Sequence, residues 1–182
     1  VDVKPIYGEV LYKSKILPPL TTVNGKVIHR DWDYLQYFIS EARRLGLKVT
    51  VSTAMFPSGH PATREGLVYD EPRWDGKTCL EYTPGGKMLD IREDKKKVGA
   101  FLNPVRKDVR KFALSIVREI VKNYDVDAYA LDYCRYPGDD SDFSIDSQKA
   151  FERYLGKKIQ NFPDDIFTWN TDGTKKPGIY YK

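Results

Sequence analysis

The chain has 182 residues, 41% of them hydrophobic and 31% charged, which fits one globular domain with a substantial core. Its formal net charge is only +4, and its densest basic run, Arg92–Lys97, contains two acids, which argues against a nucleic-acid partner. No apolar run is long enough to span a membrane and no signal peptide is visible, so we expect no membrane insertion.

In chain order, the first predicted element is a strand within Val1–Val10. A helix follows over residues 30–46, where apolar side chains recur at steps of three and four, with Asp31 or Asp33 as its N-terminal cap. Gly46–Thr53 then alternates apolar and polar residues, which is typical of a strand.

A long segment without clear periodicity comes next, from Ala54 to Leu102, and it is rich in glycine, proline, tyrosine and tryptophan. A loop of this length in a compact domain is usually functional or disordered, and the aromatic content argues against disorder. The clearest helix of the chain covers Asn103–Tyr124, with Asn103 as its cap and Pro104 in its first turn. The last predicted strand is Val126–Tyr133, which we expect to be buried.

The order strand, helix, strand, helix, strand implies parallel pairing with right-handed crossovers. Short helix-to-strand links and long strand-to-helix links are typical of (β/α) barrels, whose active sites lie at the carboxyl ends of the strands. An open doubly wound sheet is the weaker fit, because no glycine-rich phosphate loop follows a strand. A closed barrel needs about 250 residues. We therefore predict an α/β fold in which residues 1–182 form a single partial (β/α)8 TIM-type barrel, covering roughly its second to fourth βα units, within a longer chain.

The strongest candidate for chemistry is Asp132 in the stretch "DAYALDYCRYP" (Asp127–Pro137). A carboxylate at the end of a buried strand needs a partner, or its pKa rises. Arg135, three residues further on, would keep Asp132 ionised for a role as nucleophile, general base or electrostatic stabiliser. The alternative is a structural Asp–Arg pair that only ties the strand to its loop.

Other candidates lie in the segments that follow the first two strands. Glu9 is expected at the same rim as Asp132, and His60 in "FPSGHP" is either a ligand-facing or an idle surface residue. Trp74 is either a platform for sugar stacking or part of a loop core. The acidic run Asp139–Asp146 lacks the glycine and the final glutamate of a calcium loop, so no metal site is predicted. No role is assigned to His29.

Four stretches together resemble a known family. The stretch "GAFLNPVRKDVRKFALSIVREIVKNYDVDAYALDYCRYPG" (Gly99–Gly138) resembles the glycosyl-hydrolase-like family 10 domain of bacteria. "DVKPIYGEVLYKSKILP" (Asp2–Pro18) resembles that family's strand start, and "SGHPATREGLVYDEPRW" (Ser58–Trp74) resembles the loop that follows its next strand. Phe143–Trp169 looks like the family's insertion after the strand that carries "LDY.RYP".

The resemblance implies a TIM-barrel glycoside hydrolase that acts on bacterial or dietary glycans and is secreted, periplasmic or attached to the bacterial surface. Many relatives carry two consecutive acids where this chain has Asp132 followed by Tyr133. Glycoside hydrolysis usually needs two carboxyl groups, about 5 Å apart for retention and about 6.5–9.5 Å apart for inversion. The partner of Asp132 is therefore left open between Glu9, Asp139 or Asp140, and a residue of an absent strand.

We predict from these observations a glycoside hydrolase with Asp132 and Glu9 as catalytic carboxylates, a glycan as substrate, and no metal or organic cofactor. The rival prediction is a non-catalytic carbohydrate-binding protein that kept the barrel and lost turnover. The sequence makes no prediction of oligomeric state. Six residues are assigned to substrate binding: Lys4, Tyr7, His60, Trp74, Arg135 and Tyr136.

Overall fold

The structure is a computed structural model that describes residues 1–28 and 31–181, so His29 lies outside the described residues. Its main sheet consists of three parallel strands, β1 (Asp2–Lys4), β4 (Thr50–Ala54) and β7 (Ala128–Asp132), in the order β1-β4-β7. The three predicted strands and their parallel pairing are therefore confirmed, although each strand is shorter than its predicted segment.

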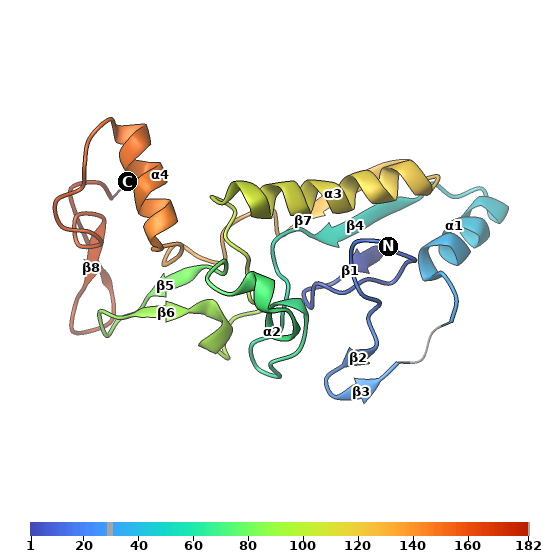
Figure 1. Ribbon diagram of the computed structural model, residues 1–182, viewed down its shortest axis with the longest axis horizontal. Coiled ribbons are helices and arrows are strands. Elements are labelled where there is room, and N and C mark those ends of the chain that lie inside the picture. The colour runs from blue at the N-terminus through green and yellow to red at the C-terminus, as the bar shows by residue number, and fades with distance from the viewer. Residues whose placement is uncertain (29–30, 182) are drawn as a thin grey trace.

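Two helices contribute the main apolar faces that cover this sheet. In Figure 1, α3 (Lys107–Asn123) runs along β4 and β7, and α1 (Tyr34–Arg44) lies near the C-terminal end of α3. Asp33 caps α1, because its Oδ1 accepts a hydrogen bond from the Gln36 N–H at 3.0 Å. The buried residues of both helices join the sheet in one core: Leu35, Ile39, Ala42, Val109, Ala113, Ile116 and Ile120 with Val3, Val49 and Val51. The fold is mixed α/β, and the described residues form no closed barrel.

The start of α3 differs from the prediction. Asn103 does not cap the helix, which begins at Lys107. The Asn103 amide nitrogen donates instead to Asp142 Oδ2 at 2.5 Å and to Ser144 Oγ at 3.0 Å, while its oxygen accepts from the Val105 N–H. The side chain is therefore held by the segment that follows β7, and the residues between Asn103 and the helix form a turn.

The long segment after β4 is ordered and contributes to the core. It contains α2 (Leu67–Asp70), two short 3-10 helices at Pro72–Trp74 and Ile91–Glu93, and the antiparallel pair β5 (Leu80–Tyr82) and β6 (Met88–Asp90). Buried side chains from this segment, among them Leu67, Val68, Cys79 and Ile91, belong to the same core as the sheet. A shorter hairpin, β2 (Thr22–Val23) with β3 (Lys26–Val27), lies in the segment between β1 and α1.

The C-terminal part forms a second, smaller core at the end of the molecule where β5 and β6 lie (Figure 1). The C-terminal part contains α4 (Ile145–Leu155) and the hairpin of β8 (Phe167–Trp169) and β9 (Lys175–Pro177), and the core residues come from β5, from β8 and from the segments on either side of α4. Tyr82 of β5 packs in this core with Phe143 and Phe167, at ring-centroid distances of 5.6 and 5.4 Å. The long segment after β4 therefore connects the two cores.

The strand that carries Asp132 is not buried as predicted. β7 is the edge strand of the sheet, and within the described residues nothing pairs with its outer side. Leu131 is 53% exposed, and Asp132 is exposed as well. The apolar residues that predicted a buried strand therefore belong to β7, an edge strand of the sheet.

The side chain of Lys4 joins the carboxyl ends of two strands. It is fully buried, and its Nζ donates to the carbonyl oxygens of Ala54 at 2.5 Å and Pro57 at 2.9 Å. Burial lowers the pKa of Lys4 to about 7, and a neutral amine has two N–H groups for these two acceptors. The prediction that Lys4 binds substrate is wrong, because no part of it reaches the surface.

Lys4→Met should remove both hydrogen bonds and destabilise the fold by about 1–3 kcal/mol near pH 9, because two buried carbonyl groups lose their partner. Between the folded pKa of about 7 and the unfolded value of 10.5, the unfolded chain binds a proton that the folded chain does not. Wild type should therefore gain stability relative to the variant as pH rises through this window. Urea unfolding at several pH values measures the difference.

Lys26→Met, at an exposed lysine of β3, is the matched control and should show no such pH-dependent difference. A Lys4→Met difference that stays constant from about pH 7 to 10 would show that the buried amine keeps its proton, contrary to this account.

Candidate functional site

The carboxyl ends of β1, β4 and β7 lie at one edge of the parallel sheet, which is where ligands bind in α/β proteins. Three segments leave the sheet there and carry most of the predicted site residues. Tyr7 and Glu9 follow β1, His60 follows β4, and Arg135 follows β7.

Close backbone packing brings the segment after β1 against the start of α2. Gly66 has φ +103°, and a Cβ at this position would lie 2.3 Å from the Tyr7 carbonyl oxygen. The same oxygen accepts a hydrogen bond from the Leu67 N–H at 2.9 Å. Gly8 has φ +85°, and a Cβ at this position would likewise lie too close to Ser58 and Leu67. Only glycine fits at these two positions, and the approach places Glu9 beside Glu65.

Five residues form what we call the Glu9 cluster: Tyr7, Glu9, His60, Glu65 and Asp70. Burial raises the pKa of Glu9 to about 7, and the nearby carboxylates of Asp70 and Glu65 add to the shift. Burial also raises the pKa of the Tyr7 phenol, with further contributions from Glu65 and Glu9. The rings of Tyr7 and His60 lie 5.6 Å apart. The cluster thus contains a carboxyl group that is half protonated near neutral pH.

Glu65 is the member of the cluster with an unused hydrogen-bonding atom. Its Oε1 accepts from the Gly25 N–H at 2.9 Å, at the tip of the β2–β3 hairpin. Its Oε2 is buried and has no hydrogen-bond partner among the described residues. Tyr7 reaches the same hairpin, because its hydroxyl donates to Asn24 Oδ1 at 3.3 Å. A buried acceptor without a partner is unusual and is suited to accept a hydrogen bond from a ligand hydroxyl.

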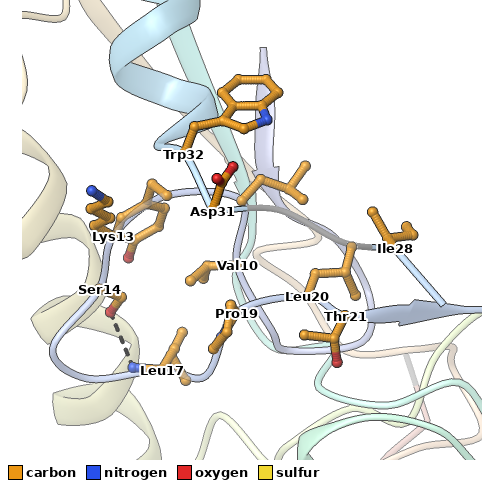
Figure 2. Close-up of a pocket in the computed structure, with 12 residues that line it drawn as sticks. Val10, Lys13, Ser14, Leu17, Pro19, Leu20, Thr21, Ile28, Asp31 and Trp32 are labelled. Carbon is orange, nitrogen blue, oxygen red and sulfur yellow. Dashed lines mark hydrogen bonds between the residues drawn. The ribbon is translucent and has the colours of Figure 1, made fainter.

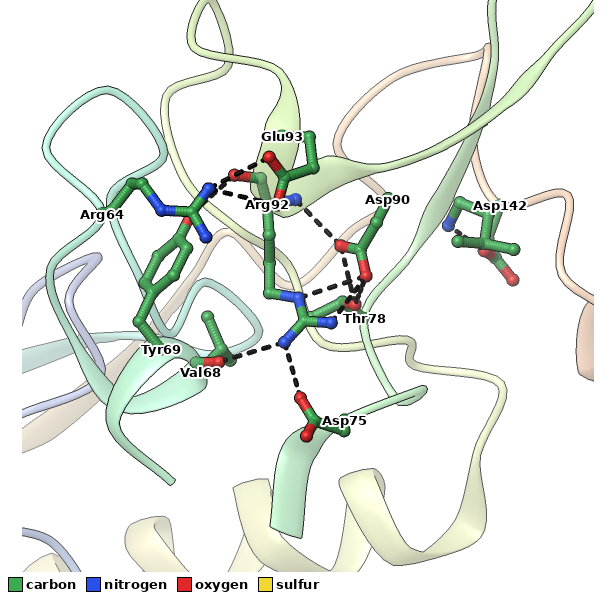
Figure 3. A network of polar contacts seen from close by, with 10 residues as sticks. Arg64, Val68, Tyr69, Asp75, Thr78, Asp90, Arg92, Glu93 and Asp142 are labelled. Carbon is green, nitrogen blue, oxygen red and sulfur yellow. Dashed lines mark hydrogen bonds and ion pairs between the residues drawn. The ribbon is translucent and has the colours of Figure 1, made fainter. Parts of the chain in front are cut away.

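A network around Arg92 ties α2 to the segments that follow it (Figure 3). The Arg92 guanidinium donates to Asp75 Oδ1 at 2.8 Å, to Asp90 Oδ2 at 2.9 Å and to the Val68 carbonyl at 3.3 Å. Within the same network, Arg64 pairs with Glu93 at 3.0 Å. Because Val68 belongs to α2, these contacts hold Asp70, two residues further on, in a fixed place.

Asp132 lies in a different carboxylate group from Glu9. Its Oδ1 accepts from the Tyr133 N–H at 2.8 Å. Its electrostatic neighbour is Asp2, whose pKa is raised by burial and further by Asp132. The two predicted catalytic acids therefore share the same edge of the sheet, but Glu9 interacts with Asp70 and Glu65, whereas Asp132 interacts with Asp2.

The predicted pairing of Asp132 with Arg135 is wrong. The Arg135 Nη1 donates to the carbonyl oxygens of Tyr136 at 2.8 Å and Pro137 at 3.1 Å, and its guanidinium lies 5.2 Å from the Tyr133 ring centroid. Arg135 therefore stabilises its own loop and does not neutralise Asp132. Both Arg135 and Tyr136 are exposed, so their assignment to substrate binding stays a prediction.

Trp74 is not a sugar platform as predicted. It is only 4% exposed, and its ring packs 4.5 Å from the Phe112 ring of α3. Asp139 and Asp140, the other candidates for a second carboxylate, are ion-paired with Lys175 at 2.5 Å and with Lys97 at 3.2 Å. Lys175 holds the pKa of Asp139 below its usual range, which makes that group unsuited to act as a general acid.

A separate hollow of about 260 Å³ begins at Val10, one residue beyond Glu9 (Figure 2). In the view shown, Asp31 and Trp32 lie on one side of it, and Leu17 and Pro19 lie on the other. Its lining is mainly apolar and includes none of the predicted site residues.

Within residues 1–28 and 31–181, no group of three or more histidine, cysteine, aspartate or glutamate side chains is arranged to hold a metal ion. A search of the same residues finds no helix with the length and apolar character needed to cross a bilayer.

Comparison with known proteins gives two matches. Residues 1–176 match the model of a family described as glycosyl hydrolase-like 10. The chain is also 36% identical over 178 residues to an S-layer-related protein of Niallia circulans. That alignment covers 92% of this chain and 11% of the relative, so the chain spans a small part of the relative's length.

Glu9→Gln should stabilise the fold above neutral pH. Folded Glu9 keeps its proton up to about pH 7, whereas the unfolded side chain loses it near 4.5. The stability that protonated Glu9 contributes is thus fully present below the unfolded pKa of 4.5 and is lost as pH rises through the folded pKa of about 7. The variant cannot ionise, so urea denaturation at about pH 8 should show a higher midpoint for the variant than for wild type, with little difference at about pH 4.5.

Glu41→Gln changes an exposed glutamate of α1 and serves as the control, for which no pH-dependent gain is expected. Equal midpoints for wild type and Glu9→Gln at both pH values would mean that Glu9 titrates as an ordinary surface carboxylate.

Proposed function

Because the chain belongs to the glycosyl hydrolase-like 10 family, we propose that it is part of a glycoside hydrolase. We further propose that the three parallel strands belong to a (β/α)8 barrel whose remaining strands lie elsewhere in the protein. The observation that carries the proposal is Glu9, a partly buried carboxyl group with a pKa of about 7 at the carboxyl edge of a parallel sheet. Glycosidases need such a group to protonate the leaving oxygen.

In the proposed reaction, protonated Glu9 is the general acid. It donates its proton to the glycosidic oxygen as the bond to the anomeric carbon breaks and positive charge develops on the sugar ring. Asp70 and Glu65 raise the affinity of Glu9 for this proton and are positioning residues. Asp132, exposed at the end of β7, is the proposed second carboxylate, which attacks the anomeric carbon directly or activates a water molecule.

Tyr7 and His60 are proposed to contact the sugar. They lie beside each other in the Glu9 cluster and come from two different strand ends. A tyrosine face and an imidazole supply both apolar contact and hydrogen bonding to a sugar ring. The name of the S-layer-related relative supports a location at the cell surface.

The second candidate function is carbohydrate binding without turnover. One observation favours it: Asp132 lies with Asp2 rather than with Glu9, and Tyr133 stands where many relatives are expected to carry a second acid. A binding protein would keep the Glu9 cluster as a hydrogen-bonding surface and would need no second carboxylate.

Three substitutions in the full-length protein separate these functions on a panel of cleavable glycans. Glu9→Gln and Asp132→Asn should each lower kcat by at least about 100-fold while glycan binding persists. Asp70→Asn should retain turnover but shift the alkaline limb of the pH–rate profile, near pH 7 in wild type, to lower pH, because a like charge next to Glu9 is removed.

Glu71→Gln, next to Asp70 but paired with Arg73, is the control and should leave the profile unchanged. Glycan binding by wild type with no hydrolysis across the panel would establish the binding function. Full activity of Glu9→Gln would rule out Glu9 as the acid.

A further inference from the structure

The structure gathers basic side chains from two distant segments into one groove between α3 and α4. A hollow of about 650 Å³ is lined by six cations: Arg106, Lys107, Arg110, Lys111, Lys149 and Arg153. A second hollow of about 520 Å³ shares Lys149 and Arg153 with the first and adds Lys157 and Lys158. In Figure 1, α4 lies beyond the N-terminal end of α3. We call the two adjoining hollows the α3–α4 groove.

The net positive charge of the chain is concentrated in the α3–α4 groove. Its eight basic residues are accompanied by three acidic ones, Asp108, Asp146 and Glu152, which gives a formal charge of +5. The complete chain has a formal net charge of +4. The rest of the molecule therefore has a net charge close to zero, and the groove is a surface that would attract a negatively charged partner.

Most of these cations are not used inside the protein. Asp108 and Asp146 pair with Arg106, and Glu152 pairs with Lys158 at 2.7 Å. The other six cations pair with no carboxylate among the ion pairs of the described residues, and Lys157 lies over the Tyr180 ring. The five that remain available are Lys107, Arg110, Lys111, Lys149 and Arg153. Arg110 Nη1 donates only to the Pro104 and Val105 carbonyl groups.

The shape and composition of the groove indicate the class of partner. Cations spread over two helices and two adjoining hollows match a polymer with repeated negative charges better than a single small anion. None of the described residues that line either hollow is aromatic, whereas single-stranded nucleic acids bind largely by stacking on aromatic side chains, so this lining favours a polymer held by its charges. The chain also belongs to a glycosyl hydrolase-like family.

We infer that the α3–α4 groove binds an anionic polysaccharide, separately from the Glu9 cluster. This surface would hold a charged glycan by its carboxylate or similar groups without taking part in bond cleavage. The inference is independent of the catalytic role of Glu9, because the groove residues come from α3, α4 and their flanking turns.

Binding of fluorescein-labelled polygalacturonate, followed by anisotropy, tests the inference. Wild type should bind at low salt and lose affinity steeply as salt rises. The double substitution Lys111→Glu and Lys149→Glu should weaken binding by at least about tenfold, because two attractive contacts become repulsive. Both side chains are exposed, so the fold should persist, which circular dichroism checks.

The matched control is Lys95→Glu with Lys96→Glu, which makes the same change in net charge on another exposed segment and should leave affinity nearly unchanged. Fully methyl-esterified polygalacturonate, which is uncharged, should not bind. Equal loss of affinity in the control, binding of the esterified polymer, or equally tight binding of inorganic polyphosphate or single-stranded DNA would each overturn the assignment to an anionic polysaccharide. Glycan turnover, measured separately, tests the Glu9 cluster without affecting this result.

Discussion

The buried amine of Lys4 is the contact on which the candidate site depends. Its two hydrogen bonds join the end of β1 to the carbonyl groups of Ala54 and Pro57, where β4 leaves the sheet. The segments that carry Glu9 and His60 begin within a few residues of this contact. A charged lysine in this place is costly, and burial lowers the pKa of Lys4 to about 7, so that above neutral pH the amine is mostly a neutral donor matched to two acceptors.

The same region concentrates negative charge at some expense of stability. The two glycines that allow the backbone after β1 to touch α2, Gly8 and Gly66, place Glu9 where Glu65 and Asp70 oppose its ionisation. The Arg92 network ties α2, which ends at Asp70, to Asp75 through the Val68 carbonyl. Proteins commonly accept this kind of strain at functional sites, because a carboxyl group that stays protonated near neutral pH can act as an acid.

Periodicity in the sequence was sufficient to predict the three parallel strands and both main helices, and it left the cap of α1 open between Asp31 and Asp33, of which the structure has Asp33. Position after a strand predicted that Glu9 lies at the same rim as Asp132, and both do follow strands that end at one edge of the sheet. Glu65 and Asp70 were missed because they reach Glu9 through close glycine packing between segments far apart in the chain, which no local pattern encodes. Their only local signal is that they flank "GLVY", the motif behind the family resemblance.

The errors also have physical causes. Lys4 and Trp74 were predicted as site residues from their polar and aromatic side chains. The sequence does not distinguish an exposed lysine or tryptophan from one that is buried as a hydrogen-bond donor or packed in the core. The basic groove was missed because its cations lie in two runs about forty residues apart, each mixed with acids. The positions of Lys4, Trp74 and the basic groove all depend on burial or on the approach of distant segments, and amino-acid composition shows neither.

The central claim is that Glu9 keeps its proton near neutral pH because it is partly buried among other carboxylates. Carbon-13 NMR of the side-chain carboxyl groups, with Glu9 assigned by comparison with Glu9→Gln, measures this directly. The account predicts a titration midpoint for Glu9 at about pH 7. A midpoint near 4.5, the ordinary value for a glutamate, would contradict it.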